Sequence, residues 1–113
     1  MKALVLGGSG FIGNHMADLL TEKGFEVTVF DRTQSPYLQE NQKMVLGSIN
    51  DLRALKEVVA GQDYVLNFAG IAGLPETKEN AVAASEVNII GNLKVLEANR
   101  DHPPKRYAFA STY

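Results

Sequence analysis

The sequence predicts an α/β fold in which five parallel strands form a doubly wound sheet, in the order 3-2-1-4-5, with helices on its flanks. Short apolar runs alternate with segments of helical periodicity along the 113 residues. A glycine-rich turn joins the first run to the first helical segment. The stretches between strands also leave room for the crossovers that parallel strands require. In such a sheet, ligands bind at the carboxyl ends of the strands, at the crevice between strands one and four.

The composition is that of an ordinary globular domain, with 45% hydrophobic and 21% charged residues. The net charge is −2 and the basic residues are scattered, which argues against nucleic acid as a partner. There is no cysteine, so disulfides and thiolate metal sites are excluded. No apolar run approaches the ~20 residues of a membrane span. The chain also starts directly on strand residues, so we expect no signal peptide, no membrane association and a cytoplasmic location.

The first unit combines a strand at Ala3–Leu6, a turn at Gly7–Gly10 and a helix at Phe11–Lys23. Glycines let the chain turn sharply and let backbone N–H groups approach a pyrophosphate, and the helix start adds aligned donors. The spacing fits two glycine patterns, Gly7-x-x-Gly10-x-x-Gly13 and Gly8-x-Gly10-x-x-Gly13. The alternative is an ordinary tight strand-to-helix turn.

Periodicity also predicts which sides of this first helix are buried and exposed. The expected apolar face consists of four residues, Ile12, Met16, Leu19 and Leu20. The polar face includes His15, which we interpret as a solvated or capping histidine rather than a catalytic one.

A second strand at Glu26–Phe30 ends in Asp31, which lies eighteen residues beyond Gly13. An acidic residue about 20 positions after the glycine motif commonly binds the adenosine ribose hydroxyls. Strand, glycine turn, helix, strand and acidic residue in this order are typical of a Rossmann-type fold. The context favours dinucleotide binding over a purely structural turn.

The remaining elements follow from turn signals and apolar patterning. Residues 33–42 are polar and predict a loop, and Asp51 is a candidate N-cap. The expected elements are strands at 44–46, 64–68 and 106–110 and helices at 51–59 and about 78–100. Ala69–Gly73 predicts a flexible turn of small residues at a strand end. On the last helix, Asn88 is either a buried structural residue or a site residue.

This topology brings four separate segments to one edge of the sheet. They are Gly7–Gly13, Asp31, Phe68–Gly70 and Ser111–Thr112, each of which lies at the carboxyl end of a strand. Their convergence predicts a single site at that edge.

With these motifs together, the chain resembles the extended short-chain dehydrogenase/reductase family, in its NAD-dependent epimerase/dehydratase branch, and looks most like the nucleotide-sugar epimerases. The matching stretches run from end to end of the sequence: Gly7-Gly-Ser-Gly-Phe-Ile-Gly-Asn-His15, Val29-Phe-Asp-Arg32, Asp63-Tyr-Val-Leu-Asn-Phe-Ala-Gly70, Glu86-Val-Asn-Ile-Ile-Gly91 and Phe109-Ala-Ser-Thr112.

The resemblance implies a set of cofactor-binding residues: Gly7, Gly10, Phe11, Ile12, Gly13, Asp31, Arg32, Ser48, Ile49, Phe68, Ala69, Gly70, Asn88 and Ser111. The glycine loop is implied to hold the pyrophosphate, and Phe68–Gly70 to pass beneath the pyrophosphate and the nicotinamide ribose. Asp31 favours NAD, because a 2′-phosphate would meet its negative charge, whereas Arg32 leaves NADP possible. Thr112 is implied to be catalytic, through a hydrogen bond to the reacting oxygen of the substrate.

The sequence departs from the family pattern at two places. Ser48 follows Gly47 where the family usually has an acidic residue that reaches the adenine amino group. The family's general base, a tyrosine in a Tyr-x-x-x-Lys helix, and its substrate domain are both absent. Tyr113 lies too close to Thr112 to be that base. We therefore interpret residues 1–113 as one NAD(P)-binding domain, the N-terminal portion of a longer enzyme.

Three hypotheses for the function remain open. The chain is the NAD-binding portion of an epimerase or dehydratase that acts on a nucleotide sugar by transient hydride transfer, inactive by itself. Alternatively, it is a non-catalytic dinucleotide-binding regulatory module, or an engineered Rossmann fragment. Because no helix follows strand five, we expect exposed apolar surface on that strand and self-association into a homo-oligomer.

Overall fold

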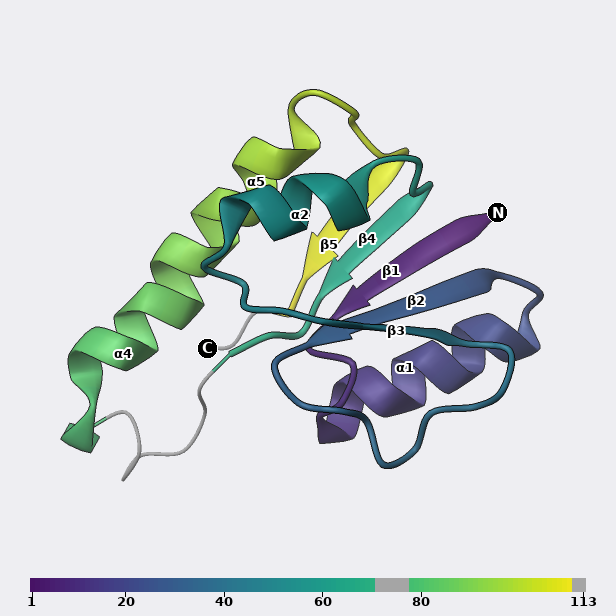
Figure 1. Cartoon of the computed structure of the whole chain (residues 1–113), viewed down its shortest axis with the longest axis horizontal. Coiled ribbons are helices and arrows are strands. Elements are labelled where there is room, and N and C mark those ends of the chain that lie inside the picture. The colour runs from purple at the N-terminus through teal and green to yellow at the C-terminus, as the bar shows by residue number, and fades with distance from the viewer. Residues whose placement is uncertain (71–77, 111–113) are drawn as a thin grey trace.

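The computed structural model describes residues 1–70 and 78–110. Its five strands form one parallel sheet in the order β3-β2-β1-β4-β5, as the sequence predicted (Figure 1). The strands are β1 Lys2–Leu6, β2 Glu26–Asp31, β3 Lys43–Leu46, β4 Tyr64–Asn67 and β5 Arg106–Phe109. Each begins and ends within one residue of its predicted bounds. The central strand pairs on both sides, with Val5 opposite Val29 of β2 and Leu66 of β4.

Helices cover the two faces of the sheet unequally (Figure 1). The helical segments are α1 Phe11–Glu22, α2 Leu52–Val59, α4 Ala81–Ser85, the π-helix η1 Glu86–Gly91 and α5 Asn92–Asn99. On one face, α2 and α5 bury Leu55 and Val95 against Leu4, Leu6 and Val65 of the sheet. On the other face, α1 packs against the alternate residues of β1 and β2. This alternation is what a strand period of two residues dictates.

The expected apolar face of α1 is wrong in part. Ile12 is 60% exposed and Leu19 is 47% exposed. The helix instead faces the sheet with small residues, including Gly13 and Ala17. A Cβ at Gly13 would lie only 2.2 Å from the carbonyl oxygen of Gly7. The helix therefore lies too close to the glycine loop for a larger side chain there, whereas Met16 is half-buried and Leu20 packs against the buried cluster as predicted.

Helix α2 matches its prediction, because the Asp51 side chain accepts a hydrogen bond of 3.1 Å from the backbone N–H of Ala54. The long helix expected over residues 78–100 is interrupted, since η1 lies between α4 and α5. At the end of η1, a Cβ added to Gly91 would lie 2.8 Å from Cγ2 of the buried Ile49. The helix therefore approaches the loop after β3 through a glycine, and that loop belongs to the site described below.

Within residues 1–70 and 78–110, no helix covers the sheet face on the α1 side at β4 and β5. A groove of about 210 Å³ runs along it, lined by Leu20, Phe25, Tyr64, Val65, Leu66, Arg106 and Ala108. The apolar surface predicted for strand five is therefore present in the structure. Among the residues that the structure describes, no helix has the length and apolar character needed to cross a membrane.

Candidate functional site

The glycine loop lies directly against the end of β4. Gly7 has a φ of +76°, and its N–H donates to the carbonyl oxygen of Phe30 at 2.8 Å. A Cβ at Gly7 would lie 2.5 Å from the backbone nitrogen of Ala69 and 2.6 Å from the carbonyl carbon of Phe68. Only glycine permits both this backbone conformation and this approach. The β1 and β4 strand ends therefore meet at backbone contact distance, as the topology predicted.

The backbone N–H groups in the first turn of α1 can bind a ligand at this site. Gly10 is the N-cap, no side chain caps it, and the first helical turn holds no acidic residue. The Asn14 side chain stabilises the turn from behind, because its Nδ2 donates to the carbonyl oxygens of Gly10 and Phe11, each at 2.7 Å. The positive end of the helix dipole is thus not neutralised by a neighbouring carboxylate of its own first turn.

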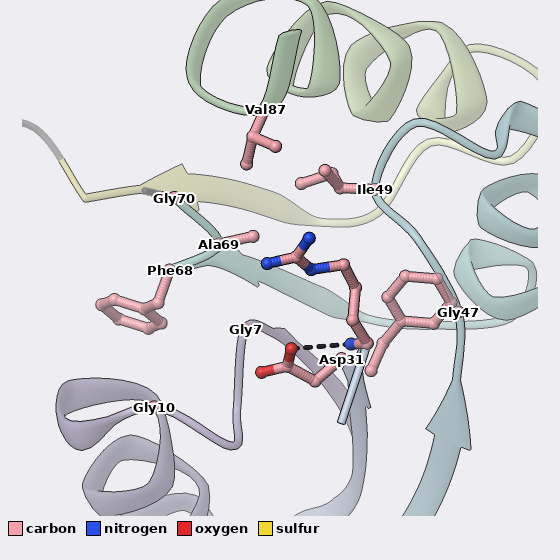
Figure 2. Close-up of a pocket in the computed structure, with 11 residues that line it drawn as sticks. Gly7, Gly10, Asp31, Gly47, Ile49, Phe68, Ala69, Gly70 and Val87 are labelled. Carbon is pink, nitrogen blue, oxygen red and sulfur yellow. Dashed lines mark hydrogen bonds between the residues drawn. The ribbon is translucent and has the colours of Figure 1, made fainter. Parts of the chain in front are cut away.

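The carboxylate of Asp31 is held in place by two backbone amides. Its Oδ2 accepts from the Ser9 N–H at 3.0 Å. Its Oδ1 accepts from the Arg32 N–H at 2.7 Å, the hydrogen bond drawn in Figure 2. Ser9 is fixed in turn, since its hydroxyl donates to the carbonyl oxygen of Thr33 at 2.7 Å. Each carboxylate oxygen keeps a further lone pair. The glycine loop therefore orients the acidic group that the sequence assigned to ribose binding.

Eight of the predicted residues line one cleft of about 120 Å³: Gly7, Gly10, Asp31, Arg32, Ile49, Phe68, Ala69 and Gly70. Figure 2 shows Gly7 and Gly10 on one side of the cleft and Ile49 and Val87 on the other. This volume is below the ~300 Å³ at which pockets for drug-sized ligands begin, so a dinucleotide would also extend along the sheet edge outside the cleft.

Three lining residues were not predicted, namely Phe30, Gly47 and Val87. Gly47 had a recognisable signal, since it directly follows β3. A Cβ at Gly47 would lie 2.6 Å from Cζ of Phe30, so glycine lets the chain pass this ring. No sequence signal marked Val87 as a lining residue, because it reaches the cleft from the π-helix η1, which the sequence did not reveal.

Other predicted residues lie beside the cleft without lining it. Phe11 is 79% exposed and Ile12 is also exposed, and neither lines the cleft. The Ser48 hydroxyl accepts from the Asn50 N–H at 3.1 Å. Asn88 is exposed, and its Oδ1 lies 3.1 Å from where a Cβ on Gly70 would stand.

Gly13 also lies outside the cleft lining, where it lets α1 approach the glycine loop. The predicted residues Ser111 and Thr112, and part of the turn predicted at Ala69–Gly73, lie outside the described residues. His15 is exposed, and its ring meets the ring of Phe11 edge-on at 5.0 Å, in keeping with the solvated interpretation.

A polar group lies behind the β4 wall of the cleft. Asn67, which is 5% exposed, accepts a hydrogen bond of 3.0 Å from the Ala69 N–H and also contacts the Tyr107 hydroxyl. Burial raises the pKa of Tyr107 above its ordinary value of 10.0, while the hydrogen bond to Asn67 acts in the opposite direction. This hydroxyl therefore keeps its proton at neutral pH.

The site offers an anion-binding helix start and loop, together with one oriented carboxylate for hydroxyl groups. Within residues 1–70 and 78–110, no three His, Cys, Asp or Glu side chains gather closely enough to hold a metal ion. This arrangement suits a ligand that carries both phosphate and ribose.

Comparison with known proteins agrees with this geometry. The sequence of residues 3–113 matches the family described as the NAD dependent epimerase/dehydratase family. A UDP-N-acetyl-alpha-D-glucosaminuronate decarboxylase of Bacillus cytotoxicus is 34% identical over 98% of this chain and 36% of its own length.

Two solved structures share the fold closely. The UDP-glucose 4-epimerase of Thermotoga maritima, solved with UDP-glucose, superposes with a TM-score of 0.93 at 32% identity, over 99% of this chain and 38% of its own. The UDP-glucose 4-epimerase of Thermus thermophilus, solved with NAD, superposes with a TM-score of 0.91 at 30% identity, over 99% of this chain and 38% of its own.

The chain thus spans little more than a third of the length of the relatives it matches. NAD, the cofactor expected from the glycine motif and Asp31, is the one named in the family description and in the Thermus thermophilus structure. The family match covers nearly every residue, and the glycine loop and the oriented aspartate lie where the motif requires them. The chain belongs to the NAD-dependent epimerase/dehydratase family.

Proposed function

We propose that this chain binds NAD along the carboxyl edge of its sheet, as the cofactor-binding portion of an enzyme that epimerises or dehydrates a nucleotide sugar. The observation that carries the proposal is the Asp31 carboxylate, held by the amides of Ser9 and Arg32 beside an uncapped helix start. The loop also fits the cofactor, because the start of α1 has no side-chain cap and no acidic residue in its first turn, so its backbone N–H groups suit an anionic pyrophosphate.

In this proposal the backbone N–H groups of Phe11, Ile12 and Gly13 at the start of α1 hold the pyrophosphate, and Asp31 accepts from the adenosine ribose hydroxyls. When bound, NAD supplies a hydride acceptor for transient oxidation of a sugar carbon. The family resemblance supports Asn88 at the nicotinamide end and Thr112 as the residue that hydrogen-bonds the reacting oxygen. The nucleotide-sugar substrate rests on relatives whose names specify UDP sugars.

Replacing Asp31 tests the proposal directly. In Asp31→Ser the carboxylate that accepts the ribose hydroxyls is lost, so NAD affinity falls by about tenfold or more, since a hydrogen bond to a charged group contributes ~1.5–3 kcal/mol. NADP binding is unchanged or improved, since the charge facing its 2′-phosphate is gone. Isothermal titration with both nucleotides measures the two affinities.

Asp63→Ser is the matched control for this experiment. The Asp63 carboxylate also accepts a backbone hydrogen bond, of 2.8 Å from the Lys2 N–H, but it precedes β4 at the opposite edge of the sheet. Its replacement leaves the ratio of NAD to NADP affinity as in the parent chain. Absence of saturable NAD binding to the folded parent chain would refute the proposed function.

A dinucleotide-binding module without turnover, or an engineered Rossmann fragment, is the alternative. It is supported by the described residues, which supply groups for binding a dinucleotide. Chromatography of the nucleotide sugar separates the two functions when a longer form of the protein that includes this chain is mixed with NAD and UDP-glucose, because the hydride is returned and no reduced nicotinamide accumulates. An epimerised or dehydrated product supports the enzyme, and tight NAD binding without such a product supports the module.

The uncovered face of β4 and β5 supports a second copy of this chain as a partner. Its groove is apolar, and Ala108 lies in it on an exposed part of β5. Light scattering on the 113-residue chain is expected to show a mass that rises with concentration. Ala108→Asp reduces this association, whereas Ala83→Asp on the exposed side of α4, outside the groove, does not. A concentration-independent monomer would contradict self-association.

A further inference from the structure

A small polar bridge joins three separate elements behind the cleft. The Tyr107 hydroxyl on β5 donates a hydrogen bond to Oδ1 of Asn92, the first residue of α5. The Nδ2 group of Asn67, at the end of β4, lies 3.1 Å from the Tyr107 hydroxyl and 3.3 Å from Asn92 Oδ1. None of the three residues lines the cleft.

The other end of the Asn67 amide faces the cleft wall. Its Oδ1 accepts from the Ala69 N–H at 3.0 Å. The two ends of an amide group are not equivalent, because one only donates and the other only accepts. Tyr107 and Asn92 accept from the donor end and thereby direct the acceptor end toward Ala69. With the amide reversed, two N–H groups would face each other in a buried place.

The Ala69 peptide transmits this arrangement to the glycine loop. The backbone nitrogen of Ala69 would lie 2.5 Å from a Cβ at Gly7, and the Ala69 Cα would lie 2.7 Å from it. The 68–69 peptide therefore rests on the Gly7 Cα with no space between them. A shift of this peptide of even a few tenths of an ångström must displace the loop or open a gap beside it.

We infer that Tyr107 and Asn92 are positioning residues of the dinucleotide cleft, which act through Asn67 to hold the 68–69 peptide against Gly7. The inference rests on the proposed function, in that the cleft so positioned is the one assigned to NAD. It links the β4–β5 pair and helix α5 to a loop from which they are distant in sequence.

Tyr107→Phe is the primary test, because it removes one oxygen atom and retains the ring. We expect NAD affinity to fall by about three- to tenfold, the range for one lost hydrogen bond, and the Ala69 amide proton to exchange faster by a similar factor. Asn92→Leu, of similar shape, has the same two effects. The double variant loses no more than either single variant, because both break one bridge.

Tyr64→Phe is the matched control. Tyr64 begins β4, and its hydroxyl has no hydrogen-bond partner among the described residues. Its ring contact with Phe25, at 5.5 Å between centroids, survives the substitution. We expect NAD affinity and Ala69 exchange to stay within about twofold of the parent chain.

The two readouts separate failure of this inference from failure of the proposed function. Ala69 exchange in Tyr107→Phe and Asn92→Leu equal to that of the control would overturn the inference, whatever the affinity. If the parent chain binds no NAD, the proposed function fails. Faster exchange of the Ala69 amide proton in both variants would then still show that the bridge holds the 68–69 peptide against the glycine loop. If the losses of NAD affinity in the two single variants add up in the double variant, Tyr107 and Asn92 do not act through one shared bridge.

Discussion

Replacing Gly7 by alanine is the sharpest test of how the glycine loop is built. The residue combines a φ of +76° with backbone neighbours at 2.5, 2.6 and 2.7 Å from the position of an added Cβ. All three neighbours belong to the Phe68–Ala69 backbone, which cannot rotate aside as a side chain can. The alanine methyl group would therefore act as a wedge between the β1 and β4 strand ends.

The expected magnitude has two parts. A left-handed backbone conformation costs an alanine about 1–2 kcal/mol. Overpacking in a close-packed region typically adds about 1–3 kcal/mol. Gly7→Ala is therefore expected to lower the free energy of unfolding by about 2–5 kcal/mol. It is also expected to abolish measurable NAD binding, because the methyl group pushes the glycine loop and the end of β4 apart.

Gly61→Ala separates the two parts. Gly61 has a nearly equal φ of +80°, and its added Cβ meets nothing within 4 Å. This variant carries the conformational strain alone, so the difference between the two variants isolates the contact with β4. Urea unfolding followed by circular dichroism measures both, and isothermal titration measures NAD affinity. Equal destabilisation by Gly7→Ala and Gly61→Ala, within ~0.5 kcal/mol, would refute the close-approach argument.

Two further predictions concern buried polar groups. Asn99 is 7% exposed, and neither polar atom of its side chain has a hydrogen-bond partner among the described residues. Asn99→Leu, of similar shape, is therefore expected to stabilise the chain by about 1–2 kcal/mol in urea unfolding, and a loss of stability would show that the amide is satisfied. For Tyr107 the folded-state pKa is raised by burial, so the folded chain holds this proton more tightly than the unfolded chain. Its contribution to stability is complete below pH ~10 and is lost as the pH rises further. Melting temperatures across this range should decline less steeply in Tyr107→Phe, and equal slopes would count against a raised pKa.

Most of the fold could be predicted from local sequence. Strand bounds were predicted within one residue, because short apolar runs end at glycine or polar residues on both sides. The Asp51 cap was also predictable, since an N-cap depends only on groups three residues apart. The strand order followed from the right-handed crossover rule rather than from any single residue.

The buried face of α1 was predicted less well. Periodicity assigned Ile12 and Leu19 to the core, whereas the structure exposes both. The helix meets the sheet and the loop through small residues such as Gly13 and Ala17, and at Gly13 the carbonyl of Gly7 leaves no space for a side chain. Hydrophobic periodicity records which residues are apolar, and it carries no information about how near the partner backbone lies.

The sequence by itself determined the sheet order, the glycine turn and the acidic residue at the end of β2, because each depends on short stretches of chain and general rules of connection. Only the tertiary structure decided the entry of Val87 into the cleft from a π-helix and the bridge of Asn67, Asn92 and Tyr107. The bridge joins residues that lie 25 and 40 positions apart. Such contacts depend on the angle and distance at which packed elements meet, and these are fixed only when the whole core closes.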